Sequence, residues 1–136
     1  MPVTVRYPLD YTCSTIGGCN NELDYPIVGY QPTGIVAHLD ASYPWLVTAT
    51  LQSYDPVNFG QNIISARFDS GVTDVTGGAG ATIPSNATKV TMQWLLVQNT
   101  NTAYHYTGWA DITYGDVGPE PPVALSNRQQ MVTILG

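Results

Sequence analysis

Charged side chains are scarce in this sequence. Asp, Glu, Lys and Arg make up 10% of its 136 residues, whereas about 25% is usual in soluble domains. The four cations, Arg6, Arg67, Lys89 and Arg128, are far apart in the chain, and the formal net charge is −6. Because binding nucleic-acid phosphates or an anionic membrane takes a cluster of cations, we expect neither as a partner.

Long apolar runs are also absent. None approaches the ~20 residues of a membrane-spanning helix, so we expect no membrane span. The first residues, MPVTVRYPLDYTC, lack the apolar centre of a secretory signal. No signal peptide is therefore visible in this chain, which fits either a protein without one or a protein from which it was removed.

Recognisable catalytic motifs are missing as well. The sequence has no GxSxG elbow, no HExxH motif and no phosphate loop. Its only histidines are His38 and His105, too few for a histidine-based metal site. His38 and Asp40 have the spacing of a base and a carboxylate on one strand face, but such triplets arise often by chance. We expect a protein that is not an enzyme.

The strongest pattern present is the alternation of apolar and polar residues. It has the period of two of half-buried strands at residues 33–39, 45–52, 63–68, 89–96 and 104–115. Turn-forming Gly, Pro and Asn separate these segments, and no convincing helix of ten residues occurs. The sequence therefore predicts an all-β fold, an antiparallel β-sandwich or jelly roll.

The length predicts a single domain with an extension. A chain of 136 residues is long enough to bury roughly two-thirds of its unfolded surface in one core. We therefore expect one β-sandwich domain and assign residues 1–118 to it. Pro119, Pro121 and Pro122 then impose an extended linker. We expect residues 119–136 to form this linker and a C-terminal strand or arm, which would join copies of the chain into a homo-oligomer.

Segments 89–96 and 104–115 are interpreted as the two strands of a hairpin. An odd-numbered loop, with Asn101 in a left-handed conformation, places the large apolar residues of both strands on one face. An even-numbered loop would put them beside His105 and Asp111, which makes no core. With the odd loop, the opposite face carries a polar group that includes one indole: Gln93, His105, Thr107, Trp109 and Asp111.

This polar face is the candidate ligand site. Trp109 would be a plate for the C–H face of a sugar, and the four polar residues around it would hydrogen-bond the hydroxyls. The alternative is that Trp109 faces a second layer or a subunit interface, where Trp is also enriched.

Two other pairs of residues are candidates for metal binding and for cross-linking. Asp69 and Asp74 bound a glycine-containing segment whose oxygens could ligate a structural calcium ion, although the segment lacks EF-hand spacing and also fits a solvated turn. Cys13 and Cys19 frame CSTIGGC, which is either a small disulfide loop in an oxidising environment or two free thiols. Their spacing does not fit the CxxC of zinc or redox sites.

Residues 45–115 resemble the later strands of galactose-binding-like jelly-roll carbohydrate-binding modules. The resembling pieces are WLVTATLQ, IISARF, ATIPSNATKVTMQWLLV and YHYTGWADITYG, with Pro84, Ala87, Val90, Trp109, Asp111 and Ile112 fitting the pattern. The resemblance covers about half the chain. It implies a β-sandwich that binds glycans without cleaving them, sometimes with a structural calcium ion.

Three functions follow in order of preference. The first is a glycan-binding, lectin-like module with a polysaccharide partner. The second is a structural or assembly protein of a phage or virus surface, because low charge and a terminal arm suit symmetric assembly. The third is a small β-sandwich membrane-active toxin. All three place the protein outside the cell or on a particle surface.

Overall fold

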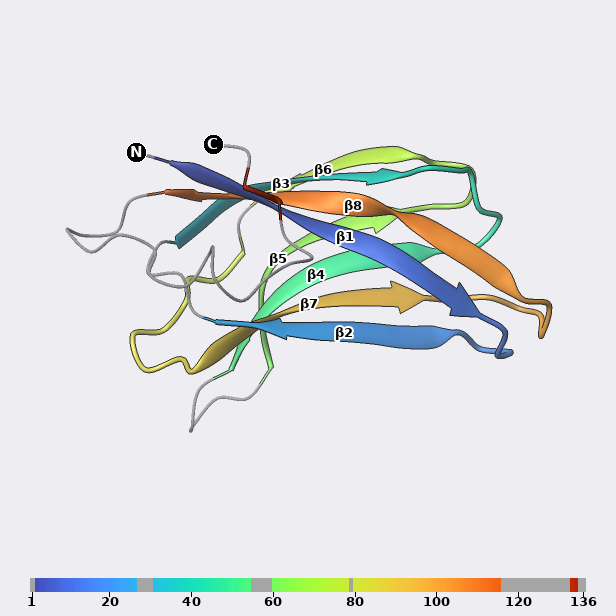
Figure 1. Cartoon of the computed structure of the whole chain (residues 1–136), viewed down its shortest axis with the longest axis horizontal. Coiled ribbons are helices and arrows are strands. Elements are labelled where there is room, and N and C mark those ends of the chain that lie inside the picture. The colour runs from blue at the N-terminus through green and yellow to red at the C-terminus, as the bar shows by residue number, and fades with distance from the viewer. Residues whose placement is uncertain (1, 27–30, 55–59, 79, 116–132, 135–136) are drawn as a thin grey trace.

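The computed structural model describes residues 2–26, 31–54, 60–78, 80–115 and 133–134 (Figure 1). These residues form strands and connections, without a helix, and so contain no helical segment capable of crossing a membrane. The strands are β1 (Val3–Cys13), β2 (Cys19–Tyr25), β3 (Gln31–Leu39), β4 (Val47–Tyr54), β5 (Gln61–Phe68), β6 (Asp74–Gly78), β7 (Lys89–Leu96), β8 (Tyr104–Gly115) and β9 (Thr133–Ile134).

The strands form two antiparallel sheets. One has the order β6-β3-β8-β1-β9 and the other β2-β7-β4-β5. The pairs β1–β8, β2–β7, β3–β6 and β4–β5 are those of one long eight-stranded hairpin. Folding that hairpin over adds the pairs β3–β8 and β4–β7, which gives the connectivity of a jelly roll. The predicted all-β sandwich is confirmed.

The core lies between the two sheets. Alternate side chains of each central strand point into it, as the period of two requires. The predicted inward faces are confirmed, since these side chains are at most 2% exposed: Ile35, Ala37 and Leu39; Val47, Ala49 and Leu51; Val90, Met92, Trp94 and Leu96; Tyr106, Ala110 and Ile112.

The predicted hairpin of β7 and β8 is wrong. β7 pairs with β2 and β4, whereas β8 pairs with β1 and β3 in the other sheet. Asn101 is not left-handed either, because no described residue other than glycine has a positive φ. The alternation identified the inward side of each strand. Two inward sides can meet across a core as well as side by side, and the pattern does not distinguish the two arrangements.

Apart from β9, three strands lie outside the five segments in which the alternation predicts strands. β1 continues through Pro8 to Cys13, where the outer edge of β1 has a described partner only at Val5 and Arg6. A proline is tolerated in such a strand because its nitrogen can face the open edge. The other two strands outside those segments are β2 and β6. Both are polar or glycine-containing strands, CNNELDY and DVTGG, so they show no strong apolar alternation.

The C-terminal prediction is only partly within the described residues. Thr133–Ile134 form β9, which pairs with β1 of the same chain. The rest of the predicted linker and arm lies in residues 116–132 and 135–136, outside the described part. The domain division at residue 118 therefore stays a prediction.

Candidate functional site

The predicted ligand-binding residues of β8 lie on the outer face of the five-stranded sheet. β8 runs between β3 and β1 in that sheet (Figure 1). The register places Trp109 opposite His38 of β3 and opposite Pro8 of β1. Because the neighbours of Trp109 in β8 face the core, its indole is directed outward among polar side chains from three strands.

Arg6 covers the indole from the side of β1. Its guanidinium carbon lies 4.0 Å from the centroid of the Trp109 ring. The same guanidinium donates two hydrogen bonds to Asp111, from Nε to Oδ1 at 2.7 Å and from Nη2 to Oδ2 at 2.9 Å. This hydrogen bonding raises the pKa of Arg6. The fork geometry and the cation–π contact together fix the guanidinium over the ring.

His38 approaches the indole from the side of β3. The imidazole and indole centroids are 5.4 Å apart, with the ring planes 29° from parallel. The imidazole also contacts two carboxylates, with Nδ1 2.8 Å from Asp74 Oδ1 and Nε2 3.3 Å from Asp40 Oδ1. The hydrogen bond with His38 lowers the pKa of Asp74. Since β3 and β1 flank β8 on opposite sides, Trp109 lies between Arg6 and His38.

His105 and Thr107 lie on the same face, nearer the start of β8. Nε2 of His105 contacts Asp10 Oδ1 at 2.5 Å. Thr107 is opposite Asp10 in the register, and its backbone N–H donates to the Tyr43 hydroxyl at 3.1 Å. These two residues therefore belong to the outer face of the five-stranded sheet, where the His105 side chain and the Thr107 backbone contact partners other than the indole.

Gln93 does not join the other four residues. It lies in β7 of the opposite sheet, where its amide nitrogen donates to Glu22 Oε1 at 3.0 Å. Its expected place beside Trp109 followed from the hairpin that does not form. The structure thus brings Trp109, Asp111, His105 and Thr107 onto one face and leaves Gln93 on the other sheet.

The two candidate calcium ligands turn toward different partners. Asp69 Oδ1 accepts a hydrogen bond from Arg67 Nε at 3.0 Å. Asp74 is engaged by His38 and by the Thr73 hydroxyl, which donates at 3.1 Å. Among the residues that the structure describes, no group of three or more His, Cys, Asp or Glu side chains could hold a metal ion. The calcium prediction gains no support from this geometry.

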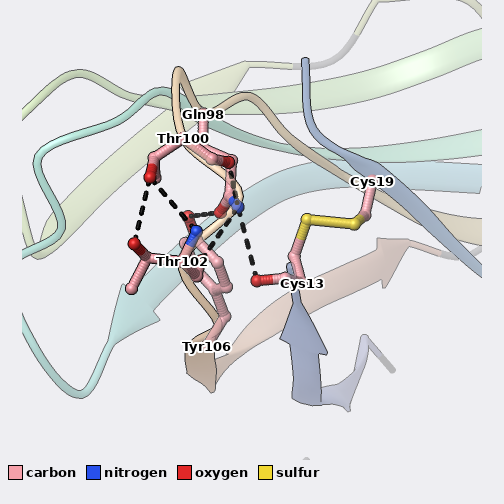
Figure 2. Close-up of a disulfide and its surroundings, with 6 residues drawn as sticks. All are labelled: Cys13, Cys19, Gln98, Thr100, Thr102 and Tyr106. Atoms are coloured by element: carbon pink, nitrogen blue, oxygen red, sulfur yellow. Dashed lines mark hydrogen bonds between the residues drawn. A yellow bond between two sulfur atoms is a disulfide. The ribbon is translucent and has the colours of Figure 1, made fainter. Parts of the chain in front are cut away.

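Cys13 and Cys19 form a disulfide, which resolves the alternatives left open by the sequence. The bond joins the end of β1 in one sheet to the start of β2 in the other. Figure 2 shows the buried amide of Gln98 beside it. The amide nitrogen donates to the carbonyl oxygens of Cys13, Thr100 and Thr102, at 3.4, 3.1 and 3.3 Å respectively.

The sequence pattern does not predict the structural role of Gln98. Its amide oxygen accepts a hydrogen bond from the Tyr106 hydroxyl at 3.1 Å. The side chain therefore joins the β7–β8 connection to the end of β1 and to the core of the other sheet. A glutamine after an apolar strand carries no periodic signal, so only the tertiary arrangement reveals that it is buried.

Comparison with known proteins gives likenesses of structure only. No protein-family model matches the sequence, and no curated protein matches it. The crystal structure of the infectious bursal disease virus VP2 subviral particle is similar with a TM-score of 0.50 and 12% identity, over 98% of this chain and 36% of that one. The structure of the Gx strain of that virus has a TM-score of 0.49 and 15% identity, and the match covers 92% of this chain and 36% of the viral chain. A family two carbohydrate esterase from Cellvibrio japonicus has a TM-score of 0.31 and 10% identity, and the match covers 87% of this chain and 37% of the esterase chain.

These likenesses concern the fold. This chain spans little more than a third of the length of the viral chains that it resembles. The expected membership of the galactose-binding-like modules finds no matching family model, and the likeness to the esterase is too loose to support it. The chain has the jelly-roll architecture that viral capsid and lectin domains share, and the VP2 particle is a solved example that it resembles.

Proposed function

We propose that this chain is a non-catalytic structural protein of a phage or virus surface. The observation that carries the proposal is the likeness to the VP2 subviral particle, which extends over 98% of this chain. A shared fold does not by itself imply a shared function. The proposal therefore rests also on what the surface of this chain is suited to do.

The polar groups on the outer face of the five-stranded sheet mostly engage one another. Asp111 binds Arg6, Asp74 contacts His38, and Asp10 contacts His105. Side chains already paired in this way offer few free donors or acceptors to a small ligand. Low overall charge, 10% of the residues, also suits a subunit that packs among others, because fewer ions are desolvated at each contact.

Glycan binding is the competing function. A sugar stacks on an aromatic ring through an open ring face, but Arg6 and His38 flank Trp109. Binding there would require Arg6 to leave both the indole and its paired carboxylate. A glycan array probed with the protein and with Trp109→Ala tests this function directly, since selective binding that the variant loses would favour the lectin-like role.

The direct test of the structural role is assembly of the purified full-length chain. Sedimentation velocity over a range of concentrations, together with negative-stain electron microscopy, should show a defined symmetric oligomer or shell. Because the net charge is −6, raising the salt concentration should screen repulsion between copies and favour assembly. A chain that stays monomeric under all these conditions would contradict the proposal, and selective glycan binding would then favour the competing function.

A further inference from the structure

We infer that an apolar corner of the four-stranded sheet is a surface through which one copy of this chain contacts another. The apolar corner consists of Ile16, Leu95 and Val97. The inference rests on the proposed assembly function and adds to it by naming the contact surface and its occupant, a second copy of the chain.

The three side chains are exposed on the same part of the molecule. Ile16, Leu95 and Val97 are 63%, 43% and 38% exposed, and the only other large apolar side chain so exposed among the described residues is Val36, on the other sheet. Leu95 and Val97 are two residues apart and both point away from the core. The turn that carries Ile16 runs beside them, because the N–H of Gly17 donates to the carbonyl of Gln98 at 2.9 Å.

The position of Ile16 is fixed by its surroundings. The disulfide closes the turn on both sides, and Gln98 holds the neighbouring connection (Figure 2). Gly18 has φ of 115°, and a Cβ there would lie 1.9 Å from the backbone oxygen of Leu96. Only glycine therefore lets the turn lie so close to β7. An exposed side chain held in this way loses little conformational freedom when a partner covers it.

Charge indicates which partner fits the apolar corner. Residues 14–20, 44–50 and 94–103, which include the ends of β2, β4 and β7 at this side of the four-stranded sheet and their connections, contain no Asp, Glu, Lys or Arg. Arg67 lies beyond them in β5, opposite Thr48, and pairs with Asp69. A neutral apolar surface offers no attraction to a cationic or anionic partner.

The other faces are less suited to contact between copies. The outer face of the five-stranded sheet carries four carboxylates and one arginine: Asp10, Asp40, Asp74, Asp111 and Arg6. The edge strand β2 exposes Glu22 and Asp24, and charged side chains discourage pairing between strand edges. Two copies with net charge −6 therefore meet with least repulsion at the apolar corner.

The size of the apolar corner fits a contact that is repeated in an assembly. Three partly exposed side chains provide much less than the about 800 Å² per partner of a stable two-protein interface. An isolated pair of copies held only there would dissociate readily. In a particle, however, each copy makes several contacts at once, and weak contacts then reinforce one another.

The test compares the full-length chain with two neutral variants of the apolar corner and one matched control. Leu95→Gln combined with Val97→Thr alters the strand side, and Ile16→Ser alters only the turn. Val36→Thr, at a side chain 48% exposed on the opposite sheet, is the control. Self-association is measured by sedimentation velocity, and thermal unfolding of each variant reports whether it folds.

We expect each of the two apolar-corner variants to raise the dissociation constant of self-association about tenfold or more, as for loss of a central contact. Val36→Thr should assemble like the unmodified chain. Equal assembly of all four proteins would overturn the inference and leave the proposed function intact. A loss as large in Val36→Thr would overturn it too, because the effect would not be specific to the apolar corner. An unmodified chain that never associates would overturn both the inference and the proposed function.

Discussion

The side chains of Gln98 and Tyr106 form a buried hydrogen bond between the two sheets. Gln98 lies in the connection that leaves β7 of the four-stranded sheet, and Tyr106 lies in β8 of the five-stranded sheet. The Tyr106 hydroxyl donates to Gln98 Oε1 at 3.1 Å, and both side chains are at most 2% exposed. The same glutamine amide binds the carbonyl of Cys13, so one side chain connects the crossing from β7 to β8 with the disulfide-bonded end of β1.

Replacing Gln98 should destabilise the fold strongly. In Gln98→Leu the Tyr106 hydroxyl and three carbonyl oxygens lose their amide partner, and an unsatisfied buried polar group costs about 1–3 kcal/mol. We expect the free energy of unfolding, measured by urea denaturation, to fall by about 2 kcal/mol or more.

Gln93→Leu is the matched control for that substitution. Gln93 lies on the outer face of its sheet and has Glu22 as its side-chain partner. A surface change of this kind alters stability by about 0.5 kcal/mol or less. Equal losses in the two variants would show that the buried amide of Gln98 is not important for stability.

Removing the disulfide should also lower stability. The bond closes a loop with a sequence separation of 6, for which restriction of the unfolded chain gives about 2 kcal/mol. We expect Cys13→Ala combined with Cys19→Ala to unfold at lower urea concentration than the oxidised protein. Reduced unmodified protein should behave similarly, and a transition unchanged by either treatment would contradict the stabilising role.

Stability should fall in alkaline solution because of three buried tyrosines. Burial raises the pKa of Tyr25 to about 12 and also raises the pKa values of Tyr7 and Tyr114. Unfolded tyrosine titrates near pH 10, so above that pH the unfolded state has lost protons that the folded state retains. The stabilisation is therefore fully present below about pH 10 and decreases as the pH rises toward the folded-state values.

Absorbance at the tyrosinate band, followed together with circular dichroism, measures this effect. The chain has nine tyrosines, and the buried ones should ionise only as the circular dichroism signal of the sheets disappears. Complete ionisation near pH 10 with an intact fold would contradict the prediction.

The arginine above Trp109 should be sensitive to a conservative substitution. Arg6→Lys keeps the charge but loses the two-pronged hydrogen bonding with Asp111 and the planar contact with the indole. We expect a loss of about 1 kcal/mol in the free energy of unfolding and a change in tryptophan fluorescence. Arg67→Lys is the control, since both side chains of the Arg67–Asp69 pair are largely exposed and such pairs contribute little. Equal, negligible effects would show that Arg6 does not stabilise this face.

The sequence predicted the architecture because the alternation is a local property of each strand. Leu96 is buried and Leu95 exposed, as the period of two requires. Strand pairing is a long-range property, and the burial of β7 and β8 is the same whether they share a sheet or face each other. The pairing of β8 with β1, where Val5 is opposite Ile112, leaves no mark in the sequence of either strand.

The candidate site was predicted in part for the same reason. Trp109, Asp111, His105 and Thr107 belong to one strand, so their shared face followed from its alternation alone. Arg6 and His38, which flank the indole, come from β1 and β3, and only the sheet order brings them to it. The sequence alone therefore does not predict that Arg6 and His38 flank Trp109, although these two side chains determine whether the indole ring is open to a ligand.

Sedimentation velocity of the full-length chain is the most direct test of the proposed role in a particle. At rising protein concentration, in low and then in high salt, we expect a defined oligomer whose population grows with both variables, since copies with net charge −6 repel less when screened. A single monomeric species throughout, from folded and oxidised protein, would contradict the proposed role in a particle.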